Sequence, residues 1–226
     1  MILQGTLVNA GAIAGGCLIG HLAGQHISPS LRRTMMAGLG LAVLLVGAQL
    51  ALQGKQILII IASLIAGGLL GELAAIEQRL QSFGEHLQQR FGSQSTIAEA
   101  MVTASLLYCV GAMAIMGALQ DGVGEPPTIL YAKAALDGIA SIALTATLGI
   151  GVLFSIFPLL IYQGGLTLLA GWASTVMTQT AIAEMNGVGG LLILAIALDL
   201  LDIKRLPIGN LLPAVFIALL LVHLTL

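Results

Sequence analysis

The sequence predicts an all-α integral membrane protein, a polytopic bundle of about eight transmembrane helices. Of its 226 residues, 58% are hydrophobic and only 8% are charged, whereas soluble domains carry about 25% charged residues. The apolar runs are unbroken for about twenty residues, the length of helix that crosses the hydrocarbon core of a bilayer. These properties exclude a soluble globular domain, a disordered chain and a β-barrel, whose strands alternate polar and apolar residues.

Eight apolar segments follow one another along the chain. They cover residues 6–23, 34–52, 56–75, 98–119, 131–151, 152–171, 187–203 and 208–226. The fifth and sixth segments form one stretch that is too long for a single span, and Gly149 and Gly151 provide places for a turn. A bundle of seven helices, in which part of this stretch is re-entrant, is the alternative.

The basic residues predict the orientation. With eight spans, three loops on one side of the membrane hold six of the eight Lys and Arg residues. They are Arg32, Arg33, Arg79, Arg90, Lys204 and Arg205, while the opposite side holds Lys55 and Lys133. Because cytoplasmic loops are enriched in Lys and Arg, we expect both termini to lie outside.

The segment 77–91 is the longest polar stretch of the chain. Its apolar residues, Leu80, Phe83, Leu87 and Phe91, recur at helical spacing. This pattern predicts an amphipathic helix on the cytoplasmic membrane face, which either joins two halves of the bundle or docks a soluble partner. The expected organisation is a single membrane domain (1–226) with a first helical half (1–76), a cytoplasmic linker (77–97) and a second helical half (98–226).

Two kinds of internal duplication are compatible with the sequence. The tetrapeptide Gly-Gly-Leu-Leu occurs at 67–70 and again at 189–192, so a parallel repeat of four plus four helices would pair these segments. An inverted repeat of three plus three helices around the linker is the alternative, and such repeats are common in transporters. Both stay open, because Gly and Leu are abundant in the whole chain.

Small residues recur every four positions in the first and third apolar segments. They are Gly16, Gly20 and Gly24, followed by Ser63, Gly67 and Gly71. In lipid, such a row lets another helix backbone approach closely. We expect these faces to pack within the chain, and homo-oligomerisation through a glycine-rich face is the alternative.

Asp137 is the strongest candidate for a functional group inside the membrane. Ionisable side chains at membrane depth are costly and often mark ion or solute sites. Lys133 lies four residues earlier, so the two form either an ion pair at the outer rim of the bundle or part of an ion or proton site. Ser141 and Thr145 continue the same helix face, which either lines a pathway or packs against a neighbouring helix.

Four further polar residues extend this candidate site. Glu184 and Asn186 lie just before the seventh segment, in a stretch (172–187) that is too polar and short to span. We expect an outer loop helix there, with a re-entrant hairpin as the alternative. Asn9 and Gln163 are amides inside the first and sixth segments. With eight spans, these four residues and Asp137 all fall in the outer half, as ligands for a small solute or ion.

Two other polar residues are assigned structural roles. Asn210 in the last segment is expected to form a hydrogen bond between helices. Glu72 lies near a cytoplasmic helix end, where a solvated cap paired with Arg79 is expected.

The search for catalytic and cofactor motifs gives no candidate. The chain has no HExxH, GxSxG or P-loop sequence, and its four histidines are not clustered at metal-ligand spacing. We therefore expect no catalytic residue, metal or cofactor, and the net charge of -2 without a basic stripe predicts no nucleic-acid partner. The leading hypothesis is a transporter or channel for a small solute or ion. The alternative is a membrane scaffold or assembly partner without transport activity, and an intramembrane enzyme is the third.

Several motifs, taken in order, resemble one family over nearly the whole chain. They include VNA at 8–10, GG at 15–16, GLGLAVLLVG at 38–47, GGLLGE at 67–72, YCVGAMAI at 108–115, QDG at 120–122, AK at 132–133, LD at 136–137, LGIGV at 148–152, YQG at 162–164, VGGLL at 188–192 and GNLLPA at 209–214. This order resembles the bacterial membrane proteins grouped as domain-of-unknown-function family 554. The resemblance implies a bacterial inner-membrane protein, and it carries over no catalytic or binding residue.

Overall fold

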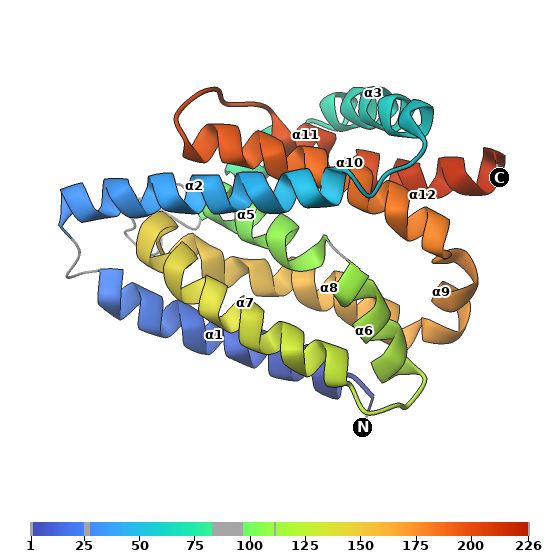
Figure 1. The fold of residues 1–226 in the computed structure, drawn as a ribbon, viewed down its shortest axis with the longest axis horizontal. Helices are drawn as coiled ribbons and strands as arrows, with labels where there is room; N and C mark the ends of the chain where they lie inside the picture. Colours follow the sequence, from blue (N-terminus) through green and yellow to red (C-terminus); the bar gives the residue numbers. More distant parts are fainter. Residues whose placement is uncertain (1, 25–27, 83–96, 111, 226) are drawn as a thin grey trace. The chain divides into compact units, whose positions relative to one another are not determined.

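A computed structural model describes residues 2–24, 28–82, 97–110 and 112–225, without the side chains of residues 32, 112, 174 and 175, and every regular element in these ranges is helical. The elements, labelled in Figure 1 where space allows, are α1 (Gln4–Gly24), α2 (Pro29–Ala51), α3 (Ile57–Leu73), α5 (Ile97–Cys109), α6 (Ala112–Gly122), α7 (Thr128–Leu148), the 3-10 helix η1 (Ile150–Ser155), α8 (Ile156–Leu168), α9 (Ala170–Val176), α10 (Gln179–Leu200), α11 (Ile208–Leu211) and α12 (Pro213–Thr225). A short helix, Ile76–Ser82, follows α3.

The described helices confirm the all-α membrane class. Six continuous helical stretches are long and apolar enough to cross a membrane, and the number rises to eight if each of two bent pairs forms one span. Two of the six join neighbouring elements: Ile150–Leu168 comprises η1 and α8, and Ile208–Thr225 comprises α11 and α12. The first pair, α3 with Ile76–Ser82, bends by 53°, and the second, α5 with Met113–Gly122, bends by 65°. The first bend coincides with Ala75, whose φ of 51° lies in the left-handed region that a helix does not use.

The chain folds into two compact units. Unit 1 comprises Met1–Met35 and Gly84–Thr175, and unit 2 comprises Met36–Phe83 and Val176–Leu226. Each unit therefore combines segments from both sides of the linker and differs from the two halves of the sequence. The two Gly-Gly-Leu-Leu segments lie in α3 and α10, which both belong to unit 2.

In unit 1, α1 and α7 pack in parallel through small residues. A Cβ on Gly16 would clash with the backbone of Gly138, and one on Gly20 with the backbone of Ile142. A step of four residues along α1, from Gly16 to Gly20, thus corresponds to a step of four residues along α7, from Gly138 to Ile142. The row Gly16–Gly20–Gly24 is therefore covered by α7 within the chain, as expected from the close packing of small residues in lipid.

The helix after α7 runs in the opposite direction. On α8, Gln163 contacts both Thr6 and Asn9 of α1, while Thr167 lies next to Thr6. This pairing makes α8 antiparallel to α1, and so to α7. Gly149, with a φ of 89°, joins α7 to η1, which leads directly into α8. The fifth and sixth segments are thus two separate candidate spans, of 21 and 19 residues, which favours eight helices over seven.

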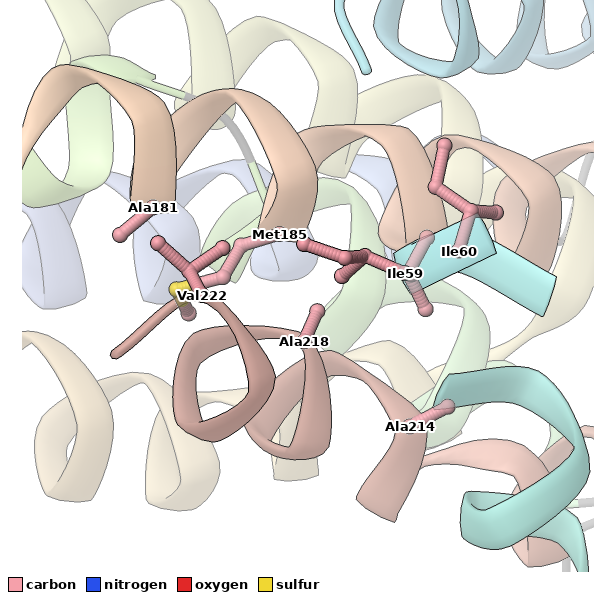
Figure 2. Packing of buried hydrophobic residues seen from close by; sticks show 8 residues of the cluster. Ile59, Ile60, Ala181, Met185, Ala214, Ala218 and Val222 are labelled. Carbon is pink, nitrogen blue, oxygen red and sulfur yellow. The ribbon is translucent and has the colours of Figure 1, made fainter. Parts of the chain in front are cut away.

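In unit 2, an apolar cluster joins α3, α10 and α12 (Figure 2). Ile59 and Ile60 of α3, Met185 of α10 and Val222 of α12 are each at most 9% exposed. Ala218 of α12 is fully buried between them. Of the candidate spans, α10 is the most enclosed, because 78% of its most apolar window is buried. The polar residues of α10 are therefore held in fixed positions.

The structure contradicts the expected loop helix or hairpin at residues 172–187. α9 ends at Val176, and α10 begins at Gln179, where the Thr178 hydroxyl accepts a hydrogen bond from the backbone N–H of Ala181. Glu184 and Asn186 therefore lie inside α10 and not before it. The prediction failed because the segment was judged too short and too polar to span, whereas its second part belongs to α10 and its polar side chains find partners inside unit 2.

The predicted amphipathic helix is only partly within the described residues. The helix Ile76–Ser82 forms its first turns, and Leu80 is half-buried beside Gly209 of α11. Phe83, Leu87 and Phe91 lie outside the described residues.

The two neighbouring glycines of α1 provide a matched test of the α1–α7 contact. We expect Gly16→Ala to lower the free energy of unfolding by about 1–3 kcal/mol, because its methyl group overpacks a backbone contact. Gly15→Ala should leave stability unchanged or raise it by up to about 1 kcal/mol, because nothing lies within 4 Å of that position. Thermal unfolding of the purified protein in detergent measures both, and equal effects would contradict the packing.

Candidate functional site

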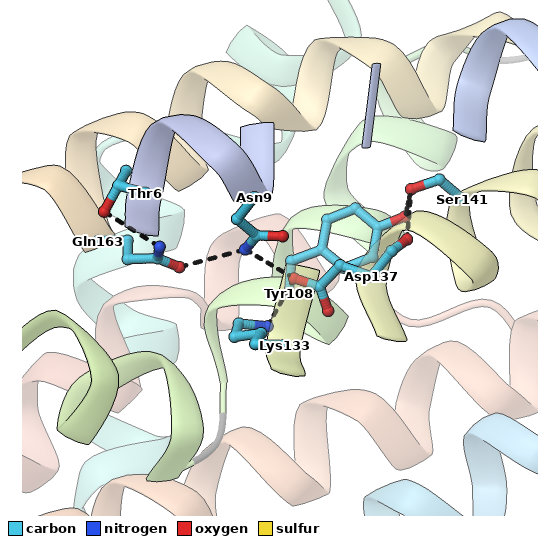
Figure 3. Close-up of polar contacts among 7 residues, drawn as sticks. All are labelled: Thr6, Asn9, Tyr108, Lys133, Asp137, Ser141 and Gln163. Carbon is cyan, nitrogen blue, oxygen red and sulfur yellow. Dashed lines mark hydrogen bonds and ion pairs between the residues drawn. The ribbon is translucent and has the colours of Figure 1, made fainter. Parts of the chain in front are cut away.

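Three helices of unit 1 bring buried polar side chains together. They are Thr6 and Asn9 of α1, Lys133 and Asp137 of α7, and Gln163 of α8, here called the unit 1 cluster (Figure 3). None is more than 7% exposed. Residues three or four apart lie on one face of a helix, so the local spacing on α1 and α7 directs each pair toward the same region.

An ion pair forms the centre of the unit 1 cluster. Lys133 Nζ lies 2.7 Å from Asp137 Oδ2, and the Asn9 side-chain amide donates to the same oxygen at 2.9 Å. The predicted i,i+4 pair is thus present and shielded from solvent. Its strength is increased by that shielding, because charges attract more strongly away from water.

The orientation of the Asn9 side chain follows from its neighbours. Its amide nitrogen faces the Asp137 carboxylate and, at 3.4 Å, the Gln163 carbonyl oxygen. Both are acceptors, so the reverse orientation would place two oxygens together. Gln163 in turn donates to the Thr6 hydroxyl at 3.1 Å. The Asn9 carbonyl oxygen is left buried without a hydrogen-bond partner.

A chain of hydroxyl groups extends from Asp137 along α7. The Ser141 hydroxyl donates to the Asp137 carbonyl at 2.7 Å, so the Tyr108 hydroxyl, 2.7 Å away, must donate to Ser141. Thr145 follows one turn later, buried against Gly20 of α1. Ser141 and Thr145 therefore pack between helices, and a pathway along them stays a prediction.

Glu184 belongs to α10 in unit 2, and its side chain lies at the N-terminus of α3. Its Oε1 accepts hydrogen bonds from the backbone N–H groups of Lys55 and Gln56, at 2.9 and 3.0 Å. The side chain is fully buried, and Oε2 has no hydrogen-bond partner. Gly54 and Gly187 allow this approach, since their Cα positions leave no room for a Cβ in the contact between the turn and α10.

Asn186 lies two residues after Glu184 on α10 and binds the same turn. Its amide donates to Gln53 Oε1 at 2.7 Å. The structure thus brings Asn9, Asp137 and Gln163 together in unit 1, and it places Glu184 and Asn186 in unit 2.

A third set of polar residues, Glu72, Glu77 and Asn210, connects α11 by hydrogen bonds to the end of α3 and the bend that follows it. Asn210 donates to Glu72 at 2.6 Å and accepts from the backbone N–H of Glu77 at 2.8 Å. Glu77 accepts from the backbone N–H of Gly209 at 2.7 Å. The expected interhelical hydrogen bond of Asn210 is confirmed. Glu72 was expected to pair with Arg79, and the structure shows that it accepts a hydrogen bond from the side-chain amide of Asn210.

Sequence reasoning missed several members of these groups. Thr6 and Tyr108 could have been noticed in the sequence, because each places a hydroxyl group inside an apolar segment. Thr6 is close in sequence to Asn9, a predicted site residue, and Tyr108 faces Ser141, another one. Asp121 accepts from the backbone N–H of Gly5 at 3.0 Å, and Gln53 binds Asn186. These two partners lie 116 and 133 residues away from the groups that they bind, so local periodicity gave no indication of them.

Comparison with known proteins identifies the family. The family model described as "Protein of unknown function (DUF554)" matches residues 4–223. The chain belongs to the DUF554 family. This confirms the resemblance expected from the sequence motifs.

Two curated proteins match this chain over nearly their full length. One is the uncharacterized membrane protein YdfK of Bacillus subtilis (strain 168), 33% identical over 94% of this chain and 93% of that protein. The other is the uncharacterized protein YqgA of Escherichia coli (strain K12), 31% identical over 95% of this chain and 94% of that protein. No solved structure matches. The protein is therefore a membrane protein of an uncharacterised family.

The ion pair in this DUF554 protein predicts a strong coupling between its partners. Lys133→Met should lower the free energy of unfolding by about 3–5 kcal/mol, because Asp137 is left buried without its cation. Adding Asp137→Asn to that variant should restore most of the loss, since the uncompensated charge is removed. Lys55→Met, at an exposed lysine, is the matched control. Unfolding of wild type, Lys133→Met, Asp137→Asn, the double variant and Lys55→Met in detergent measures the coupling, and strictly additive effects of the two single substitutions would contradict it.

Proposed function

We propose that the protein is a transporter or channel for a small solute or ion, in the bacterial inner membrane with both termini outside. The observation that carries the proposal is the buried Lys133–Asp137 pair, surrounded by amides of two other helices. Removing two charges from water is expensive even when they are paired. Ionisable residues inside membrane bundles are therefore found mainly where a function requires them.

The hydrogen-bonding pattern supports a ligand in the unit 1 cluster. Asn9 Oδ1 is a buried acceptor without a donor, and such groups are uncommon in native proteins. A ligand that brings a hydroxyl, an amine or a cation would satisfy this oxygen. In this proposal Asp137 carries the charge of the site, and Asn9 and Gln163 supply polar contacts.

Ligand binding is tested first by thermal unfolding in detergent. We test sodium, potassium and small metabolite anions, and we also vary the pH. The proteins are wild type, Asp137→Asn and the control Asp202→Asn, whose carboxylate is exposed. A compound at one hundred times its Kd stabilises the folded state by about 2.7 kcal/mol. We expect a shift in wild type and Asp202→Asn that is lost in Asp137→Asn.

Flux is then measured in liposomes with the compound that shifts unfolding. Asp137→Asn, measured alone and together with Lys133→Met so that Lys133 is not left buried without its anion, should abolish uptake in the folded protein because the charge that binds the solute is gone. Asp202→Asn should retain uptake. Unchanged uptake in Asp137→Asn would refute the assignment. Absence of a shift with every compound would favour the scaffold function, which is tested by co-purification of a stoichiometric partner and its loss on substitution of Leu80.

The proposed topology has its own test. Alkaline phosphatase, which is active only outside the cytoplasm, is fused after Leu226 or inserted after Arg205. We expect activity at Leu226 and none at Arg205, because Lys and Arg favour cytoplasmic loops. A fluorescent protein that folds only in the cytoplasm should give the opposite result. Activity of the phosphatase at Arg205 would contradict the eight-span orientation.

A further inference from the structure

Glu184 is a fully buried carboxylate that uses only one of its two oxygens. Oε1 accepts from two backbone N–H groups, while Oε2 is inaccessible to solvent and has no partner. A carboxylate has about four acceptor positions. The side chain therefore presents an unused negative oxygen to the interior of unit 2.

Two other carboxylates of the described residues, Asp137 and Glu77, are compensated more fully. Asp137 lies against Lys133 at 2.7 Å. Glu77 caps α11 much as Glu184 caps α3, but both of its oxygens are used, by Gly209 N–H and by Gln81 at 3.0 Å. Glu77 is also partly exposed. Glu184 thus combines complete burial with an unpartnered oxygen, and Glu77 provides a matched comparison.

The surroundings explain why only part of the negative charge is stabilised. Oε1 faces the N-terminus of α3, where backbone N–H groups and the helix dipole favour an anion. Oε2 receives no hydrogen bond and lies near Gly54, where a Cβ would be 3.5 Å from it. Because Gly54 has no side chain, it contributes no hydrogen-bonding group there.

The charged groups on neighbouring elements do not supply the missing positive charge. In the turn between α2 and α3, the basic residue is Lys55, and α12 carries His223; both are exposed. The His223 ring bonds to the carbonyl of Leu219 on its own helix. The described part of α2 within unit 2 carries no ionisable residue, and the one on α3, Glu72, binds Asn210. An ionised, buried carboxylate without a cation is unfavourable.

We propose that Glu184 Oε2 is the binding atom for a proton, and that this proton is coupled to transport. The coupling role rests on the proposed transport function, whereas the binding itself does not. A proton on Oε2 neutralises the charge that Oε1 presents to the N-terminus of α3. It thereby weakens the two hydrogen bonds that Glu184 of α10 accepts from the backbone N–H groups of Lys55 and Gln56. Hydrogen bonds to an ionised acceptor are about twice as strong as those to a neutral one.

Infrared difference spectroscopy of the full chain in liposomes tests binding directly. One arm compares acidic with alkaline buffer without alkali metal ions, using choline chloride as the salt. The other arm replaces choline chloride by sodium chloride, and then by potassium chloride, at constant pH. Wild type, Glu184→Gln and the control Glu77→Gln are measured in both arms.

We expect a carboxyl signal in wild type and Glu77→Gln that is absent from Glu184→Gln. This signal is the carbonyl band of a protonated acid in the pH arm. The salt arm is the control, and a change of the Glu184 carboxylate bands with sodium or potassium at constant pH would contradict a site for a proton. Identical difference spectra for wild type and Glu184→Gln in the pH arm would overturn the proposal.

A second variant guards against misfolding of Glu184→Gln. Glu184→Asp keeps the carboxyl group and shortens its reach to the turn, so a folded Glu184→Asp protein should show the signal at a shifted frequency. An unshifted signal would also overturn the proposal. These measurements are independent of flux: loss of uptake in Asp137→Asn with no effect on the Glu184 signal separates the two sites. Absence of uptake in wild type would remove only the coupling role.

Discussion

The fold depends on how helix N-termini satisfy their backbone N–H groups away from water. The first four N–H groups of any helix have no partner within it, and lipid provides none. The residues before α3 and α11, Gln56 and Pro207, form no side-chain cap. Carboxylates from distant helices bind backbone N–H groups at or just before these helix starts. Asp121 binds Gly5 of α1, Glu77 binds Gly209 of α11, and Glu184 binds Lys55 and Gln56 immediately before α3. Each of these bonds satisfies a donor and fixes one helix against another within its unit.

Close approach of backbones makes these long-range caps reachable. In unit 2, Gly187 and Gly190 of α10 lie against the end of α2 and the following turn, where a Cβ would clash. The turn is thereby drawn toward α10, and its N–H groups come within 3.0 Å of Glu184. Small residues thus do more than tighten packing: they decide which polar groups can meet.

The sequence predicted what depends on local spacing. Composition and run length gave the membrane class, and the four-residue spacing of Lys133 and Asp137 gave the ion pair. The contact between Asn9 and Gln163 spans 154 residues, so the sequence marked both amides as buried without revealing their partnership. Glu184 and Asn186 were assigned to a loop because their segment was judged too short and too polar to span. In α10 the polar side chains instead point to partners, and the Thr178 cap fixes the helix start eight residues earlier than expected.

The interleaved composition of the units has a consequence for biosynthesis. Unit 2 needs residues 36–83 and 176–226, so its first helices leave the ribosome long before α10 and α12 exist. During that interval the glycines of α3 and the N–H groups at its start have no partner from the chain. Unit 1, whose last segment ends at Thr175, is complete earlier. Residues 36–83 are therefore synthesised before the helices that they pack against, and the backbone N–H groups of Lys55 and Gln56 have no bond to Glu184 until α10 is made.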